Sequence, residues 1–171
     1  MAAHLIHAFL SAGYNVRGTL RSHSSIPKIQ AAQGDLSSHL TFAIIPDMSV
    51  PGAFDEAAKG VSGIIHSASP FVLTPKDNES ELLQPAIRGT VNVLEAAAKV
   101  PDLSRVVITS SFAAILDMSK GYRPGYTYTE NDWNPATYAE AVRIFSWFLY
   151  HNFNVSRIIR NCALLDLMSF S

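Results

Sequence analysis

The chain has 171 residues, of which 48% are hydrophobic and 16% charged, and its formal net charge is -1. These values fit one globular domain with a sizeable core and exclude a low-complexity chain. The near-balanced charge provides neither a basic face for nucleic acid nor an acidic tail. Cys162 is the single cysteine, which excludes an intramolecular disulfide and favours a reducing, cytoplasmic setting.

The sequence predicts neither a membrane span nor a metal site. Its longest apolar stretch, residues 144–150, is far shorter than the about 20 residues that cross a bilayer as a helix. The first five residues lack the basic and apolar pattern of a signal peptide. His4 and His7 share a predicted helix, but no carboxylate or cysteine nearby completes a ligand set. We therefore expect no membrane, no nucleic acid and no metal as binding partners.

The first third of the chain alternates between helical and extended patterns. Apolar spacing predicts a helix over residues 3–12, with Gly13 at the position of a left-handed cap. Alternating polar and apolar residues predict a strand over 14–20. A second helix is expected to begin at Ser24 or Ser25, to accept Pro27 in its first turn, and to end near Gly34.

The rest of the chain continues this alternation. The predicted strands are 41–45, 61–66 and 105–108, each a short β-branched or apolar run. Helix formers occupy 51–59, and residues 79–99 have the spacing of a long amphipathic helix that Pro85 perturbs. Strands alternating with helices predict an α/β domain, a doubly wound parallel sheet with helices on both faces.

Several motifs occur in a fixed order along this pattern. They are LSAGYNVRGTLRS at 10–22, IPDM at 45–48, HSASP at 66–70, RGTVNVLEA at 88–96, VVITSS at 106–111 and DWNPAT at 132–137. Together they resemble the extended short-chain dehydrogenases/reductases of the NAD-dependent epimerase/dehydratase type. The similarity is greatest to fungal NADPH-dependent aldehyde and ketone reductases and dihydroflavonol reductases. It implies a Rossmann-like domain over residues 1–141, followed by a non-homologous tail over 142–171.

The resemblance implies NADP(H) as cofactor. Arg21 follows the strand at which such domains recognise the ribose, and no acidic residue at that turn would favour a free 2′-hydroxyl. Lys28 matches a second phosphate-contacting lysine of the plant relatives in the family. Considered alone, however, Arg21 and Lys28 are explained equally well as solvated charges beside a turn.

The resemblance assigns two further segments to the dinucleotide. Asp47 and Met48 are expected to meet the edge and face of the adenine, and Ala68, Ser69 and Pro70 to line the dinucleotide path. Both segments follow predicted strands, and ligands of open α/β sheets bind beyond the carboxyl ends of strands. Ordinary turn chemistry is the alternative explanation for an Asp after Pro46 and for a Ser-Pro pair.

Ser111 matches the catalytic serine of the family. In that role its hydroxyl hydrogen-bonds the carbonyl oxygen of an aldehyde or ketone substrate as hydride arrives. A serine at the end of a strand also commonly satisfies backbone groups of the following loop. The neighbouring Phe112, Ala113 and Ala114 favour the family interpretation.

Two family features have no counterpart in this sequence. The first is the initial strand with its glycine-rich pyrophosphate turn, so the predicted sheet is incomplete and leaves two pairs of strands, with residues 155–159 as one candidate to fill the gap. The second is the Tyr-x-x-x-Lys proton donor pair, since Tyr138 is followed by Val142 and Tyr150 by Asn154. We expect both tyrosines to serve in packing or at the surface.

Two functional hypotheses follow. In the first, the protein is an NADPH-dependent reductase of small carbonyl compounds whose catalysis is impaired or lost. In the second, it is a non-catalytic relative that acts by binding or regulation, or the product of a truncated gene model.

Overall fold

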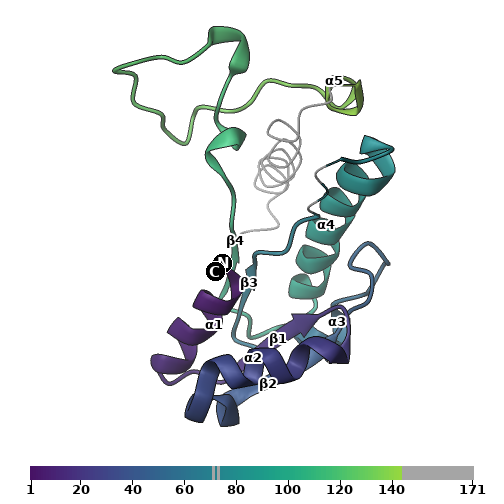
Figure 1. The fold of residues 1–171 in the computed structure, drawn as a ribbon, viewed down its shortest axis with the longest axis vertical. Helices are drawn as coiled ribbons and strands as arrows, with labels where there is room; N and C mark the ends of the chain where they lie inside the picture. Colours follow the sequence, from purple (N-terminus) through teal and green to yellow (C-terminus); the bar gives the residue numbers. More distant parts are fainter. Residues whose placement is uncertain (71, 73, 144–171) are drawn as a thin grey trace.

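The computed structural model describes residues 1–70, 72 and 74–143, and the account below concerns these residues. Figure 1 shows a lower body that holds the strands, a long helix along one side, and an extended arm at the top. The elements alternate between helix and strand, as the sequence pattern predicts. The tail residues 144–171, and with them Tyr150, Cys162 and the candidate strand at 155–159, lie outside the described residues.

The first helix ends at the predicted glycine cap. Helix α1 spans Ala2–Ser11, and Gly13 has a φ of +86°, a conformation that costs an L side chain energy. The Gly13 N–H donates to the Leu10 carbonyl and the Tyr14 N–H donates to the Phe9 carbonyl, both at 3.0 Å. The rings of Phe9 and Tyr14 pack edge to face with their centroids 5.4 Å apart. These are the bonds and the apolar contact of a Schellman cap.

The first strand starts later than predicted because of this cap. Because the Tyr14 N–H is used in the cap, strand β1 begins at Val16 rather than at residue 14 and ends at Leu20. It pairs in parallel with β2, Leu40–Ile44, in the register Val16 to Leu40. Gly18 has no side chain, so Phe42 and Ile6 come within 3.4 and 3.8 Å of where its Cβ would lie. This lets α1 pack closely on β1.

The connection between these strands is a short helical crossover. Helix α2 spans Ile26–Gln33, carries Pro27 in its first turn as predicted, and is followed by the positive-φ residue Gly34. Flanking 3-10 turns are η1, His23–Ser25, and η2, Gly34–His39. The predicted helix over 51–59 is shorter than expected, because only α3, Asp55–Ala58, is helical.

The second strand pair carries the longest helix. Strand β3, Gly63–His66, pairs in parallel with β4, Arg105–Ile108. Between them lies the predicted helix over 79–99, which is perturbed near Pro85 as expected: its first turn, η3 at Glu79–Leu83, is a π-helix, and α4 follows over Gln84–Ala98. Pro85 explains the change, since it lacks an N–H and its ring clashes with the carbonyl four residues earlier.

The described strands form two separate two-stranded sheets, β1 with β2 and β3 with β4. The α/β class and the parallel pairing predicted from the sequence are thus confirmed, and among the described residues no ladder joins the two pairs. In parallel pairs both strands end at the same edge, so the loops after β1 and β2 lie together, as do those after β3 and β4.

Beyond β4 the chain forms the arm of Figure 1, which contains the 3-10 turns η4, Phe112–Ala114, and η5, Met118–Lys120. The arm ends in α5, Tyr138–Arg143, which lies beside the upper end of the long helix (Figure 1). A capping box starts α5: Glu140 accepts hydrogen bonds from Thr137, and the Glu140 N–H donates back to the Thr137 hydroxyl at 3.3 Å. Ala141 of α5 then packs with Leu82 and Leu83 of η3 in a buried cluster.

Candidate functional site

The loop after β2 is folded around Asp47. The Ser49 N–H and hydroxyl donate to Asp47 Oδ1 at 2.8 and 2.6 Å. These bonds lower the pKa of Asp47 below its usual value, and the charges of Arg21 and Arg88 act in the same direction. Asp47 is therefore an anion at neutral pH with one oxygen committed to its own loop.

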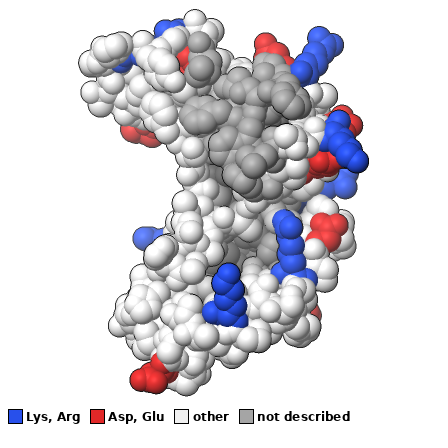
Figure 2. Space-filling view, in the orientation of Figure 1, with Lys and Arg blue, Asp and Glu red and all other residues white. Residues whose placement is uncertain are grey.

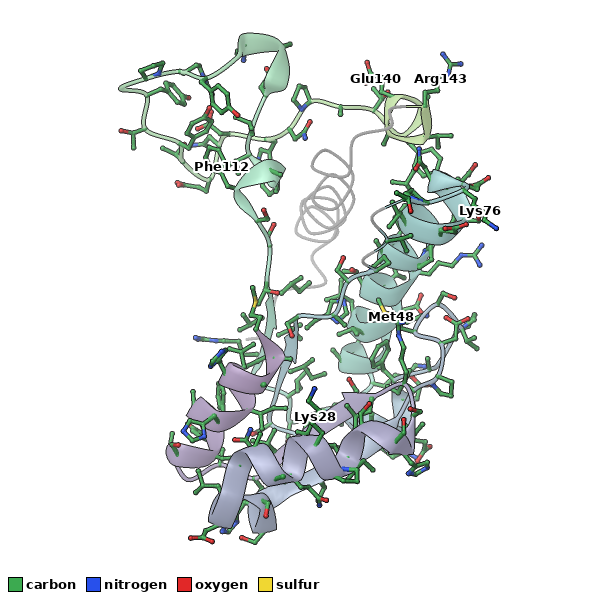
Figure 3. The ribbon with its side chains drawn as sticks, in the orientation of Figure 1. Lys28, Met48, Lys76, Phe112, Glu140 and Arg143 are labelled. Atoms are coloured by element: carbon green, nitrogen blue, oxygen red, sulfur yellow. The ribbon has the colours of Figure 1, made fainter. Side chains whose placement is uncertain are left out.

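The side chain and backbone of the same loop are held by α4. Met48 packs on Gly89, where an added Cβ would lie 2.1 Å from the Met48 Cε. Asn92 donates from its side-chain amide to the carbonyls of Met48 and Val50, at 2.8 and 2.9 Å. Figure 3 shows Met48 lying beside the lower half of α4. The expected adenine-binding segment is thus anchored to the helix.

Two cations lie on the neighbouring segment that follows β1. Arg21 comes directly after the strand, and Lys28 lies in the first turn of α2, from which it projects toward the middle of the molecule (Figure 3). Both side chains are exposed, and neither makes an ion pair or hydrogen bond within the described part of the chain. Figure 2 shows basic side chains standing on the lower half of this face. The arrangement leaves positive charge available for an anionic ligand.

An open cavity of about 260 Å³ lies between the Asp47 loop and the start of α4. Its lining residues are Ser49, Ser80, Gln84, Pro85 and Arg88. Arg88 was not among the site residues predicted from the sequence. Its position one residue before Gly89 places the cation beside the loop that carries Asp47.

The end of β3 contains two buried polar atoms without a partner. They are His66 Nε2 and Ser69 Oγ, which form no hydrogen bond among the described residues. His66 is 5% exposed, and its ring packs edge to face with that of Phe54, the centroids 6.3 Å apart. Burial lowers the pKa of His66, so the imidazole is neutral at pH 7. Ala68 and Pro70 flank Ser69 in the same segment.

Ser111 lies at the same edge as Ser69. The Thr109 N–H donates to the His66 carbonyl at 3.0 Å, which extends the β3–β4 ladder by one residue beyond the end of β4. Ser111 caps η4 by accepting a hydrogen bond from the Ala113 N–H at 3.4 Å. A hydroxyl that accepts in this way retains its hydrogen for donation. The structure therefore brings Ser111 to the edge where Ala68, Ser69 and Pro70 lie.

The arm is anchored beside Ser111 by Asn134. Its N–H donates to the Ala114 carbonyl at 2.8 Å, and its side-chain amide donates to the Ala113 carbonyl at 3.2 Å. Within the arm, Arg123 stacks on Tyr126 and Tyr128, its Cζ lying 3.5 and 4.8 Å from the ring centroids. This cation–π cluster stabilises the conformation of the arm that follows the serine.

Tyr138 is a packing residue in the structure, as predicted. Its hydroxyl donates to Glu79 at 2.6 Å and accepts from Gln84 at 2.7 Å. Burial, and the hydrogen bond to Glu79, raise the pKa of Tyr138 above its ordinary value. A tyrosine held in this way joins α5 to η3 and is poorly suited to ionise.

The sequence did not single out Asn92 or Arg123 as residues that organise the site. Asn92 could have been recognised from its position, because an asparagine on the apolar face of a helix needs hydrogen-bond partners when it is buried. Arg123 had no comparable signal, since its partners are brought together only by the folded arm.

We expect acid to destabilise the protein through His66. The imidazole titrates near 6.5 when unfolded, while burial lowers its pKa in the folded state, so the unfolded chain binds the proton more readily. The contribution of His66 to the free energy of unfolding is therefore fully present above about pH 6.5. Below that pH it decreases, by at most about 1.4 kcal/mol per pH unit for one group. Urea denaturation at several pH values between about pH 8 and pH 5 measures the free energy of unfolding. This free energy should fall less steeply with decreasing pH in His66→Asn than in His23→Asn, a control at an exposed histidine. Equal slopes in the two variants would contradict this assignment.

The fold and site together define a class. Parallel strands joined by helical crossovers, with cations, an anchored carboxylate loop and a serine at the carboxyl ends of the strands, are typical of Rossmann-type dinucleotide-dependent reductases. Residues 2–140 match the model of the 3-beta hydroxysteroid dehydrogenase/isomerase family, and the chain belongs to this family. The predicted resemblance to extended reductases is thus confirmed.

Known proteins of this type are similar over most of this chain. An uncharacterized oxidoreductase of Schizosaccharomyces pombe is 44% identical over 143 residues, which are 83% of this chain and 43% of the relative. The NADPH-dependent methylglyoxal reductase GRE2 of Saccharomyces cerevisiae is 34% identical over 144 residues, 81% of this chain and 42% of the relative. The crystal structure of yeast methylglyoxal/isovaleraldehyde reductase Gre2 complexed with NADPH superposes with a TM-score of 0.84 at 29% identity, covering 96% of this chain and 50% of that one. The chain thus spans less than half the length of these two curated relatives.

A membrane-spanning helix is absent from the described residues, none of whose helices has the length and apolar character needed to cross a bilayer. A cluster of three or more histidine, cysteine or acidic side chains suited to a metal ion is likewise absent from residues 1–143, leaving aside the two that are not described.

Proposed function

We propose that residues 1–141 form the part of an NADPH-dependent carbonyl reductase that binds the adenosine half of the cofactor and presents the substrate-polarising serine. The observation that carries the proposal is the pair of exposed cations, Arg21 and Lys28, beside the anchored loop of Asp47 and Met48; neither cation makes an ion pair or hydrogen bond with the described residues. Two cations suit a 2′-phosphate, and the turn directly after β1, residues 21–25, contains no acidic residue. Relatives named as NADPH-dependent reductases support the cofactor.

The residues at the end of β3 fit the same cofactor. Ala68 and Pro70 present little bulk, and the unpartnered Ser69 Oγ is a buried group that a ligand could satisfy. When bound, NADPH supplies a hydride to the carbonyl carbon. Ser111 would donate a hydrogen bond from its hydroxyl to the carbonyl oxygen, and this bond would stabilise the negative charge that develops there. Small aldehydes and ketones are the proposed substrates, in keeping with the names of the relatives.

Removal of the Arg21 guanidinium tests the cofactor assignment. We expect the chain to bind adenosine 2′,5′-bisphosphate more tightly than adenosine 5′-phosphate. Arg21→Ala should lower the affinity for the bisphosphate roughly 10- to 150-fold and leave the affinity for adenosine 5′-phosphate unchanged. This range corresponds to a charge-assisted contact of about 1.5–3 kcal/mol. Isothermal titration measures both affinities. The control is Arg105→Ala, an exposed arginine at the opposite end of β4. Equal affinity of the wild-type chain for the two nucleotides would overturn the proposal.

NADPH oxidation in the presence of methylglyoxal separates catalysis from binding. Consumption that depends on the aldehyde and is lowered in Ser111→Ala supports a reductase. Saturable NADPH binding without consumption supports the second hypothesis, a relative that acts through binding.

A further inference from the structure

One face of α4 contacts the loop after β2. Gly89 and Asn92 lie one turn apart on the helix, and both meet the same loop. Asn92 is 5% exposed, and its side-chain amide donates two hydrogen bonds to carbonyls of that loop. A buried amide with these partners is costly to replace, because each carbonyl would lose its donor.

The contact acts on the backbone on both sides of Ser49. Asn92 binds the carbonyls of residues 48 and 50, so the peptide units around Ser49 are held from the helix. Ser49 in turn donates two hydrogen bonds to Asp47 Oδ1. The direction of the Asp47 carboxylate is therefore set through Ser49 by the helix.

Gly89 adds a second constraint through Met48. A Cβ at position 89 would lie 2.1 Å from the Met48 Cε and 3.2 Å from its Cγ, closer than van der Waals contact allows. The absence of a side chain at Gly89 thus lets the Met48 side chain lie flat against α4. Loop backbone and side chain are held by residues on one helix face.

The remaining Asp47 oxygen is available to a ligand. Both Ser49 bonds go to Oδ1, and Oδ2 accepts no hydrogen bond from the described residues. An ionised oxygen held in a set direction is an acceptor for an amino group, whereas it repels a carbonyl oxygen. Adenine presents an amino group at C6, and hypoxanthine presents a carbonyl oxygen there.

We infer that Asn92 and Gly89 are positioning residues for base selection: by holding the Asp47 loop against α4, they make the site prefer a 6-amino purine to a 6-oxo purine. The inference rests on the proposed function, in which Asp47 meets the adenine edge. It predicts that selectivity between two bases, rather than overall affinity, depends on the helix.

The test compares binding of adenosine 2′,5′-bisphosphate with that of inosine 2′,5′-bisphosphate to the full chain. The wild-type chain should prefer the adenosine compound about tenfold, a value expected for one charged hydrogen bond. Asn92→Asp removes both donors, and the preference should fall to within about twofold. Asn131→Asp makes the same chemical change at an exposed position and should leave the preference intact. If Asn92 only stabilises the structure, Asn92→Asp should lower the affinity for both nucleotides by the same factor. That result would overturn the inference.

A second variant guards against loss of folding. Gly89→Ala pushes Met48 off the helix, so the preference for the adenosine compound should also fall. The fall is expected in a variant that melts as the wild type does. An unchanged preference in such a variant would contradict the role of Gly89.

Hydrogen exchange distinguishes failure of the inference from failure of the proposed function. In Asn92→Asp the Ser49 amide should exchange at least tenfold faster, while the Ile45 amide, bonded to the Leu20 carbonyl at 2.7 Å, should not change. If the wild-type chain binds neither nucleotide, the proposed function fails, and the inference of base selection fails with it. If nucleotides bind but the Ser49 amide and the base preference are unchanged in Asn92→Asp, the inference alone is overturned.

Discussion

Leu83→Ala is expected to lower the free energy of unfolding by about 2–5 kcal/mol, the range for a buried leucine whose removal leaves a cavity. Leu83 is 1% exposed and packs with Leu82 and Ala141, so its side chain joins η3 to α5. Urea denaturation followed by circular dichroism measures the loss. Val107→Ala is the control, because Val107 is 44% exposed and a surface change of this kind costs about 0.5 kcal/mol or less. Equal losses in the two variants would contradict the packing described.

The same variant should affect the arm more than the lower body. Helix α5 has only six residues, too few for a stable isolated helix, so its order depends on packing against η3. Amides of α5 should therefore lose protection from hydrogen exchange first, and those of β1 and β2 last. This order would show that the arm is held to the body through the Leu83 cluster.

Asp132→Ala is expected to open the arm locally and to speed its proteolytic cleavage, because it removes the carboxylate around which the turn is built. Asp132 accepts from the Tyr126 hydroxyl at 2.7 Å and from the Thr129 N–H at 2.8 Å, and Arg123 lies 3.5 Å away. Arg123 Nε is already a buried atom that has no hydrogen-bond partner among the described residues, so the loss of Asp132 would leave this cation with less compensation. Limited proteolysis between residues 115 and 133 measures the opening.

Glu130→Ala is the matched control, since it removes an exposed carboxylate from the same turn. Acid should reproduce the effect of Asp132→Ala in the wild-type chain. The hydrogen bond from the Thr129 N–H, followed by that from Tyr126, lowers the pKa of Asp132. Its stabilisation is present above the unfolded-state pKa, near 3.8, and is lost as the pH falls through the lower folded-state value. This window lies well below that of His66. Equal cleavage in Asp132→Ala and Glu130→Ala would contradict the role of Asp132.

The arm matters for function because it begins at Ser111. Phe112 follows the serine directly and packs edge to face on Tyr128, the ring centroids 5.0 Å apart. Asn134 closes the arm onto η4 two and three residues after the serine. Opening of the arm should therefore disturb the surroundings of Ser111, and this links the stability prediction to the proposed polarisation of a carbonyl.

Local patterns were read correctly from the sequence where one short segment contains the whole interaction. Gly13 caps α1 through bonds within six residues, and Pro27 occupies the first turn of α2 as predicted. Pro85 was recognised as a perturbation, but the form of that perturbation, a π-helical turn, was not predicted. The shortening of β1 at Tyr14 was missed because helix cap and strand compete for the same N–H.

The roles assigned to Arg21, Lys28, Asp47, Met48, Ala68, Ser69, Pro70 and Ser111 remain predictions. The structure adds which of them lie together: the first four follow β1 and β2, and the last four follow β3 and β4. Order along the chain and parallel pairing suffice for this grouping. The anchors of each segment, Asn92 for the Asp47 loop and Asn134 for the Ser111 loop, come from residues more than 20 positions away.

The sequence by itself determined the α/β alternation, the helix caps and the family, because these depend on short-range periodicity and on motifs that can be read in order. Only the tertiary structure decided that Asn92 and Gly89 hold the Asp47 loop, that Arg123 stacks on two tyrosines, and that His66 Nε2 is buried with no hydrogen-bond partner among the described residues. Those features arise where segments distant in the chain compete for the same space, and in such places the partner of a polar group depends on packing rather than on its neighbours in sequence.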